Sequence, residues 1–303
     1  MHILNLIRWK NLAIIIIAQV LIKYALFEPF DVNTALSTVN FMVLVVATLC
    51  CAAAGNIIND IYDVETDLIN KPEKVIIGKQ VSESLAYNLF FGCNIAAIAL
   101  GFYLSHNIGK SSFFSIFVII SLALYVYASY LKGTVVIGNL LISLLVGTSI
   151  LIVAIFDLLP MITPYNRISQ IKFFSIVVDY SVFAFLINLI REMVKDIQDV
   201  DGDYKAGMNT LPIVLGRERT GKIAFIVSML PIAAVLYFVV TYLYKNQMAL
   251  GYFLLFVIAP LIYASIKIFT AKHQKHYAHI SRIYKWIMLT GLLSLLMYPF
   301  LLK

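Results

Sequence analysis

The hydrophobic residues of this chain are gathered into nine long runs that are separated by polar segments. A helix needs about 20 apolar residues to cross the hydrocarbon core of a bilayer. The runs reach that length and are apolar at nearly every position, whereas the strands of a membrane barrel are shorter and alternate. The pattern therefore predicts an all-α integral membrane protein, with a single transmembrane domain over residues 1–303. The predicted spans are residues 11–30, 38–58, 84–104, 112–131, 134–156, 173–194, 221–243, 248–270 and 284–302.

The composition supports this fold class. Hydrophobic residues make up 61% of the chain and charged residues 13%, whereas about a quarter of a soluble domain is charged. The three cysteines, Cys50, Cys51 and Cys93, lie within apolar runs. A free cysteine packs there as a small hydrophobic residue, so we expect neither a disulfide nor a metal cluster from them.

The positive charges are divided unequally between the two sides of the predicted bundle. If the N-terminus is cytoplasmic, 17 of the 23 lysines and arginines lie on the cytoplasmic side and 6 lie elsewhere. The positive-inside rule then predicts a multi-pass protein of the plasma membrane with a cytoplasmic N-terminus. The net charge of +7 follows from this orientation, and no nucleic-acid partner is predicted because the chain has no soluble basic domain.

The acidic residues are concentrated in two polar segments on the predicted cytoplasmic side, residues 59–83 and 195–220. Of the 16 acids, 11 lie in or at the edge of these segments, which we expect to cap the bundle. The first segment has the pattern Asp60-x2-Asp63-x3-Asp67, and the second repeats it as Asp196-x2-Asp199-x3-Asp203. The identical spacing indicates that the same acidic motif occurs twice in the chain, as a weak internal repeat.

Each acidic pattern forms one stripe if the preceding helix continues into the segment. At about 100° per residue, Glu65 and Asp201 fall on the far side of their helices. The first stripe contains Asn56, Asn59, Asp60, Asp63 and Asp67, and the second contains Asn188, Glu192, Asp196, Asp199 and Asp203. Like charges at this spacing repel one another, so each stripe requires a counter-charge.

A divalent cation would supply that counter-charge more fully than lysines alone. Mg²⁺ typically takes one or two carboxylates together with phosphate oxygens. Two acidic faces that meet across a cavity would therefore hold a diphosphate through Mg²⁺. Solvated polar loops would explain one acidic segment, but they would not explain two with matched spacing on the same membrane face.

At these residues the chain resembles the UbiA superfamily of intramembrane prenyltransferases. NDIYDVETDLINKP is similar to the first aspartate-rich signature, and REMVKDIQDVDGDYKAGMNTLPIVLG is similar to the second. YASYLKGTVVIGN resembles the junction between the fourth and fifth helices. The resemblance covers nearly the whole chain. It implies nine helices around a central cavity, Mg²⁺ as cofactor, a prenyl diphosphate donor and a lipid-side acceptor.

The resemblance also implies roles for individual residues. Metal binding is implied for Asn59, Asp60, Asp63, Asp67, Asp196, Asp199 and Asp203. Diphosphate binding is implied for Lys74, Tyr127, Lys132, Arg191 and Lys195. The residues expected to act in catalysis are Asp63, Asp67, Asp199, Asp203 and Lys132. Lys74 stands where the family often has arginine, so its contact would be a point charge instead of a bidentate fork.

The second motif indicates which class of acceptor the enzyme would use. KDIQDVDGD with the following TLPI resembles the enzymes of the family that prenylate geranylgeranylglyceryl phosphate with a geranylgeranyl donor. An acceptor of this kind carries its own phosphate, for which Arg191, Lys195 and Lys205 are possible partners, although each is also a possible positive-inside anchor. The alternative is an aromatic acceptor such as 4-hydroxybenzoate, dihydroxynaphthoate or homogentisate.

Two other classes of membrane protein also use acidic residues. A divalent-cation transporter would place carboxylates near the middle of the bilayer, whereas here they gather at its edge. A CDP-alcohol phosphotransferase would carry a denser acidic motif, which the sequence lacks. The repeated histidines His273, His276 and His279 are expected to lie in a solvated juxtamembrane loop and not to bind metal.

Overall fold

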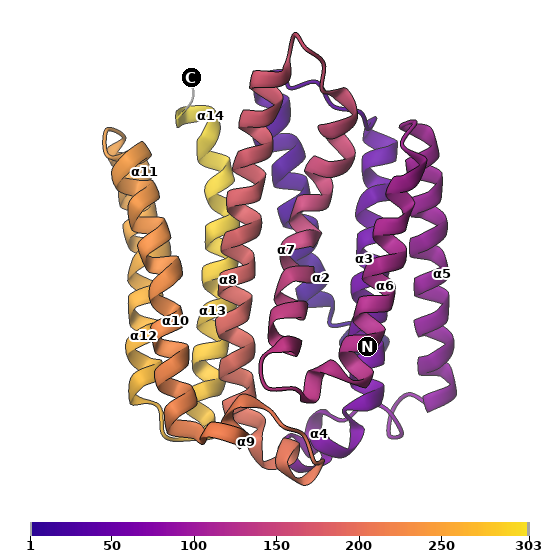
Figure 1. Cartoon of the computed structure of the whole chain (residues 1–303), viewed down its shortest axis with the longest axis vertical. Helices are drawn as coiled ribbons and strands as arrows, with labels where there is room; N and C mark the ends of the chain where they lie inside the picture. The colour runs from indigo at the N-terminus through magenta and orange to yellow at the C-terminus, as the bar shows by residue number, and fades with distance from the viewer. Residues whose placement is uncertain (1, 302–303) are drawn as a thin grey trace.

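The computed structural model describes residues 2–301, and this part of the chain is almost entirely helical. Within it, β pairing is limited to one isolated bridge between Ile77 and Val81. The long helices stand side by side, and the short helices α4 and α9 lie together at one end (Figure 1). The helices are α1 (His2–Leu6), α2 (Trp9–Leu21), α3 (Thr38–Tyr62), α4 (Val64–Asn70), α5 (Glu83–Asn107), α6 (Phe114–Ser129), α7 (Ile137–Asp157), α8 (Arg167–Lys205), α9 (Leu211–Leu215), α10 (Arg217–Phe238), α11 (Gln247–Phe253), α12 (Ala259–Thr270), α13 (Gln274–Leu293) and α14 (Tyr298–Leu301).

Nine helical segments among residues 2–301 are long and apolar enough to cross a membrane, which confirms the predicted number. Some of these segments contain more than one helix because π or 3₁₀ turns join their parts. The segments are Trp9–Phe30, Thr38–Tyr62, Glu83–Asn107, Ser111–Ser129, Ile137–Met161, Arg167–Lys205, Arg217–Leu243, Gln247–Thr270 and Gln274–Leu301.

The largest difference from the predicted boundaries is in α8. The apolar run predicted a helix over 173–194, but α8 has 39 residues and ends only at Lys205. Residues 195–205, which were expected to begin a loop, are therefore helical. They carry the second acidic stripe. Because this face of α8 includes the buried Asp203 and is turned toward protein, the helix can continue beyond the apolar run.

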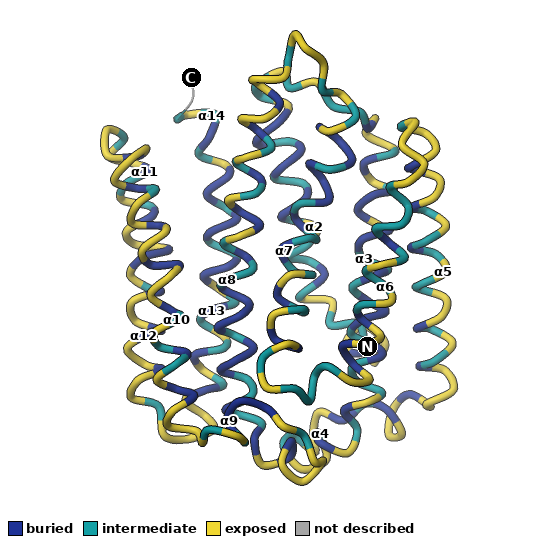
Figure 2. Tube along the Cα trace, in the orientation of Figure 1, coloured by how far each residue is buried: buried dark blue, intermediate teal, exposed yellow. Residues whose placement is uncertain are grey.

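The helices pack through small residues where their backbones approach closely. A Cβ at Gly55 of α3 would lie 2.7 Å from Leu124 Cδ2 of α6, and one at Gly101 of α5 would lie 2.2 Å from Phe117 Cδ2. Helices in membranes commonly use small residues in this way. The central helix α8 has a larger share of buried positions than α5, most of which is exposed or half-buried (Figure 2).

A buried ion pair fastens the end of the bundle that is opposite α4 and α9. Lys23 Nζ lies 2.8 Å from Asp157 Oδ2, and the two residues are 3% and 0% exposed. The other oxygen of Asp157 accepts a hydrogen bond from the Leu36 amide at 2.8 Å. Lys23 also donates to Thr34 Oγ1 at 2.8 Å. The pair thus joins the first span, the following loop and the end of α7.

Asp157→Ala is expected to lower the free energy of unfolding by about 3–5 kcal/mol, because it leaves Lys23 charged and buried without its partner. Thermal unfolding of the purified protein in detergent measures the effect. Glu28→Gln is the matched control, since Glu28 is an exposed acid in the span that carries Lys23. Equal midpoints for the two variants would contradict a structural role for the pair.

Candidate active site

A cavity of about 710 Å³ lies between the helices, and residues of α4 form part of its lining. Its polar end contains both acidic stripes, and its deeper part is apolar. All of the site residues predicted from the sequence line it: Asn59, Asp60, Asp63, Asp67, Lys74, Tyr127, Lys132, Arg191, Lys195, Asp196, Asp199 and Asp203. Lys205, in contrast, is exposed and lies outside the lining of the cavity.

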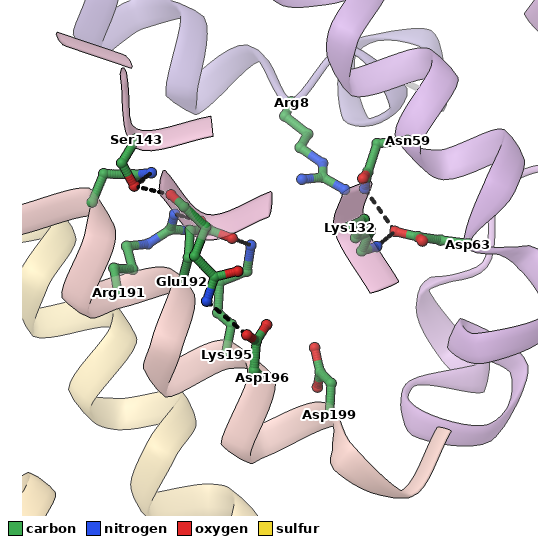
Figure 3. Close-up of polar contacts among 12 residues, drawn as sticks. Arg8, Asn59, Asp63, Lys132, Ser143, Arg191, Glu192, Lys195, Asp196 and Asp199 are labelled. Atoms are coloured by element: carbon green, nitrogen blue, oxygen red, sulfur yellow. Dashed lines mark hydrogen bonds and ion pairs between the residues drawn. The ribbon is translucent and has the colours of Figure 1, made fainter. Parts of the chain in front are cut away.

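Asp63 lies where α3 ends and α4 begins, and it is bound by two neighbours (Figure 3). Asn59 Nδ2 donates to Asp63 Oδ2 at 2.6 Å, and Lys132 Nζ forms an ion pair with the same oxygen. The second carboxylate oxygen, Oδ1, and Asn59 Oδ1 are both buried, and neither has a hydrogen-bond partner among residues 2–301. Two oxygens suited to a hard cation are therefore left unpaired at this position.

Lys132 reaches Asp63 from the short turn Leu131–Gly133 between α6 and α7. The carbonyl of Gly133 accepts a hydrogen bond from the Asn209 amide at 2.8 Å, which ties this turn to the segment after the second motif. Burial lowers the pKa of Lys132, but the charge and hydrogen bond of Asp63 outweigh it, so the pKa lies above its ordinary value. Lys132 is thus a fixed positive charge at the polar end of the cavity.

The acids of α8 have separate partners. Asn139 Nδ2 of α7 donates to Asp196 Oδ2 at 2.7 Å, and Lys71 Nζ donates to Asp199 Oδ2 at 2.6 Å. The remaining oxygen of Asp199 is buried without a partner. Burial first, and then the charge of Asp63, raise the pKa of Asp67 on the opposite side of the cavity. A nearby cation would favour the ionised form of these acids.

Helix α4 is docked directly onto the second acidic stripe. Asn70 Nδ2 donates to the Asp199 carbonyl at 2.8 Å, and the Gly202 amide donates to Asn70 Oδ1 at 3.0 Å. A Cβ at Gly202 would lie 2.3 Å from Asn70 Nδ2, so this approach requires glycine. Asn70 and Lys71 were not among the predicted site residues, although both belong to the first motif. Together they bring the two stripes to one cavity.

The sequence predicted that Asp63, Asp67, Asp199 and Asp203 would converge closely enough to share bridging Mg²⁺. All four line one cavity, but no group of three or more histidine, cysteine or acidic residues within 2–301 is arranged closely enough to hold a metal ion. Lys132 and Lys71 each occupy one carboxylate oxygen. The unpaired oxygens of Asn59, Asp63 and Asp199 are nevertheless the hard ligands that Mg²⁺ takes in ones and twos beside phosphate, so the residues fit this metal.

The cavity is apolar beyond the acids, and a polar floor lies at the depth of Thr48. Leu12, Phe117, Leu124 and Ile150 are among the apolar lining residues. Thr48 and Ser149 line the cavity at this depth, and behind them the buried Gln19 donates to Thr48 Oγ1 at 3.2 Å and to the Ser149 carbonyl at 2.8 Å. Thr48 and Asn59 are eleven positions apart on α3, which corresponds to about 16 Å of helix rise.

Residues 24–289 match the model of the UbiA prenyltransferase family. The chain belongs to this family. It is therefore a membrane prenyltransferase, as the two aspartate-rich signatures predicted. Family membership and the gathering of the acids at one end of the cavity also favour an enzyme over a cation transporter.

Curated relatives of this prenyltransferase cover most of its length. It is 32% identical over 247 residues to a digeranylgeranylglyceryl phosphate synthase of Korarchaeum cryptofilum, covering 82% of this chain and 81% of the relative. It is 33% identical over 224 residues to the enzyme of that name from Thermococcus sibiricus, covering 74% of this chain and 71% of the relative.

Solved structures share the fold of this prenyltransferase. A structure of digeranylgeranylglyceryl phosphate synthase superimposes with a TM-score of 0.63 at 25% identity, covering 98% of this chain and 97% of the other. A UbiA homologue from Archaeoglobus fulgidus bound to GPP and Mg²⁺ gives a TM-score of 0.58 at 14% identity, covering 98% and 99%. At that identity the second likeness concerns the fold alone.

Proposed function

We propose that this prenyltransferase transfers a geranylgeranyl group from its allylic diphosphate to geranylgeranylglyceryl phosphate in a Mg²⁺-dependent reaction. The observation that carries the proposal is the 32–33% identity to digeranylgeranylglyceryl phosphate synthases over most of the chain. The cavity supports it, since its charged end suits a diphosphate and its apolar depth suits an isoprenoid chain. The excess of basic residues on one side supports placing this end at the cytoplasmic face of the plasma membrane.

The chain's own residues would bind and orient both reactants. The bond between the allylic carbon and the diphosphate oxygen would break with its electron pair leaving on the diphosphate. The acceptor hydroxyl oxygen would bond to that carbon, and its proton would pass to water or to the released diphosphate. Lys132, Lys71 and Lys74 would contribute positive charge as the diphosphate leaves, which is electrostatic stabilisation of the transition state. The apolar lining would exclude water from the allylic cation.

The acidic stripes would hold the metal at the leaving group. Asn59, Asp60, Asp63 and Asp67 would serve from one side of the cavity, and Asp196, Asp199 and Asp203 would serve from the other. Bound Mg²⁺ would neutralise charge on the diphosphate. Tyr127 lines the cavity beside these residues and is buried, so it would help to close the polar end to water.

A panel of acceptors tests the proposed function. Purified protein in lipid nanodiscs is given geranylgeranyl diphosphate and Mg²⁺ together with geranylgeranylglyceryl phosphate, 4-hydroxybenzoate, 1,4-dihydroxy-2-naphthoate or homogentisate. We expect product from the ether lipid phosphate and none above background from the aromatic acceptors, as measured by mass spectrometry. Prenylation of an aromatic acceptor without the ether lipid would overturn the acceptor assignment but not the family.

A further inference from the structure

We propose that Arg8, Arg191, Lys195 and Lys285 form a second anion site in the cavity, where Asp60 and Glu192 of the acidic stripes are already paired with cations, and that this site binds the phosphate of the acceptor lipid. The identity of the acceptor rests on the proposed function. The site itself rests on the placement, charge and unused hydrogen-bond donors of these residues. It assigns Arg191 and Lys195 to the acceptor and not to the donor diphosphate, which the sequence resemblance had implied.

The four cations line the same cavity as the acids, but those of α8 lie deeper in it. Asn188, Arg191, Glu192 and Lys195 follow at intervals of three, one and three residues, so they share the face of α8 that carries Asp199. Lys195 precedes Asp199 by about 6 Å of helix rise and Arg191 precedes it by about 12 Å. Figure 3 shows the same separation, with Arg191 and Lys195 at a distance from the group of Asp63 and Lys132.

The charges of this region leave a surplus that matches a phosphate monoester. Arg8 pairs with Asp60 at 2.5 Å, while Arg191 and Lys195 share Glu192 at 3.1 and 2.7 Å. The four cations less the two carboxylates that pair with them, Asp60 and Glu192, leave a formal charge of +2. A phosphate monoester carries about −1.5 to −2 at neutral pH. The phosphate of the acceptor lipid would therefore offset this positive charge. Beside the acidic stripes, a phosphate without bound metal would instead be repelled by the carboxylates.

Two of the cations have donor capacity that the protein does not use fully. Arg191 Nε is buried and has no hydrogen-bond partner in the part of the chain that the structure describes. Lys285 Nζ donates to the neutral Asn11 Oδ1 at 2.6 Å and forms no ion pair within residues 2–301. Buried donors without partners are costly, and an ammonium that lines a cavity without an acid suits an anionic ligand.

Arg8 is held toward the cavity in an unusual backbone conformation. Its φ of 53° lies in the left-handed region, which is uncommon for residues other than glycine. Two residues of α3 fix it, because Asp60 pairs with its guanidinium and Asn56 Nδ2 donates to the carbonyl of Ile7 at 2.9 Å. A positive-inside anchor would extend to the membrane surface and would not need this arrangement.

The test compares two charge-removing variants of one helix. Lys285→Gln removes a cation of the proposed site, and Arg282→Gln removes an exposed cation one turn away that does not line the cavity. Losing a charged hydrogen-bond donor is expected to raise the KM for geranylgeranylglyceryl phosphate about tenfold in Lys285→Gln. The KM for geranylgeranyl diphosphate should change less than about twofold, and Arg282→Gln should match the wild type.

A dephosphorylated acceptor provides a second readout. The wild type should prefer geranylgeranylglyceryl phosphate to geranylgeranylglycerol in kcat/KM, and Lys285→Gln should reduce that preference about tenfold, whereas Lys285→Arg should restore most of it. If Lys285→Gln does not fold, Arg191→Lys is measured instead, since it keeps the charge but lacks the Nε donor. The same rise in acceptor KM is expected.

Three results would overturn the site. One is an unchanged acceptor KM in a folded Lys285→Gln variant or in its Arg191→Lys substitute. Another is an equal rise in the KM for donor and acceptor, which would assign these cations to the diphosphate. The third is a wild type without any preference for the phosphorylated lipid. If the wild type prenylates only an aromatic acceptor, the proposed function is wrong. This failure can be told from failure of the phosphate site because it is seen with the wild type alone.

Discussion

Asp63→Asn is expected to lower the rate of prenyl transfer by about two to three orders of magnitude, the size seen when one transition-state contact is removed from a preorganised site. Asp63 contacts both Asn59 and Lys132, and within residues 2–301 its second oxygen is one of two buried oxygens without a hydrogen-bond partner at this position. Asparagine has nearly the same shape but no charge, so it would weaken metal binding and leave Lys132 without its partner. Initial rates with saturating donor and acceptor measure the loss.

Glu65→Gln is the matched control for Asp63→Asn. Glu65 lies two residues further along the chain, is exposed and does not line the cavity. We expect it to retain activity within about twofold of the wild type, since exposed charges interact weakly. Circular dichroism establishes that both variants are folded. Similar rates for the two variants would show that Asp63 has no special part in the reaction.

Removal of divalent cations with EDTA is expected to lower prenyl transfer by about a hundredfold or more, because the metal neutralises charge on the leaving diphosphate. Added Mg²⁺ should restore the rate, whereas K⁺ at the same ionic strength should not. The unpaired oxygens of Asn59, Asp63 and Asp199 are the observation behind this expectation. Radiolabelled donor and thin-layer separation of the lipid product provide the rate.

Thermal stability gives a check on the metal that does not depend on turnover. Donor diphosphate and Mg²⁺ together should raise the unfolding midpoint, since ligands that bind only the folded state stabilise it. Donor with EDTA should raise it much less. Full turnover in EDTA, or equal stabilisation with and without the metal, would contradict the role given to the acidic stripes.

Local regularities made much of this protein predictable from its sequence. A continuous apolar run predicts a membrane helix, and the helical repeat alone predicts the two acidic stripes. The stripe geometry required the sixth span to continue past its apolar part, and α8 does so up to Lys205. The hydropathy boundary at residue 194 was wrong because a helix end is not set by hydropathy when an acidic face is turned toward protein.

The partners of the acids were not predictable in the same way. Lys71 and Asp199 are 128 positions apart, and Arg8 and Asp60 are 52 positions apart. Periodicity carries no information about such pairs, because they arise only when distant helices pack together. The same reason explains why Lys285, near the end of the chain, joins the site without any signal in its local sequence. Asn70 belongs to the first aspartate-rich motif, but its contact with α8 depends on Gly202, which lies far away in the sequence.

Under the proposed function, the polar cluster at the depth of Thr48 would limit the length of the isoprenoid chain that the cavity accepts. Gln19, Thr48 and the Ser149 carbonyl are joined by hydrogen bonds at the bottom of an apolar shaft, and separating such buried groups without replacing their bonds is costly. A tail that ends above Thr48 would lie mostly among apolar side chains, whereas a longer tail would press against this polar cluster. Under the proposed function, the upper limit on donor length is therefore set at the end of the cavity furthest from the chemistry, so that chain-length selection and catalysis can be altered independently.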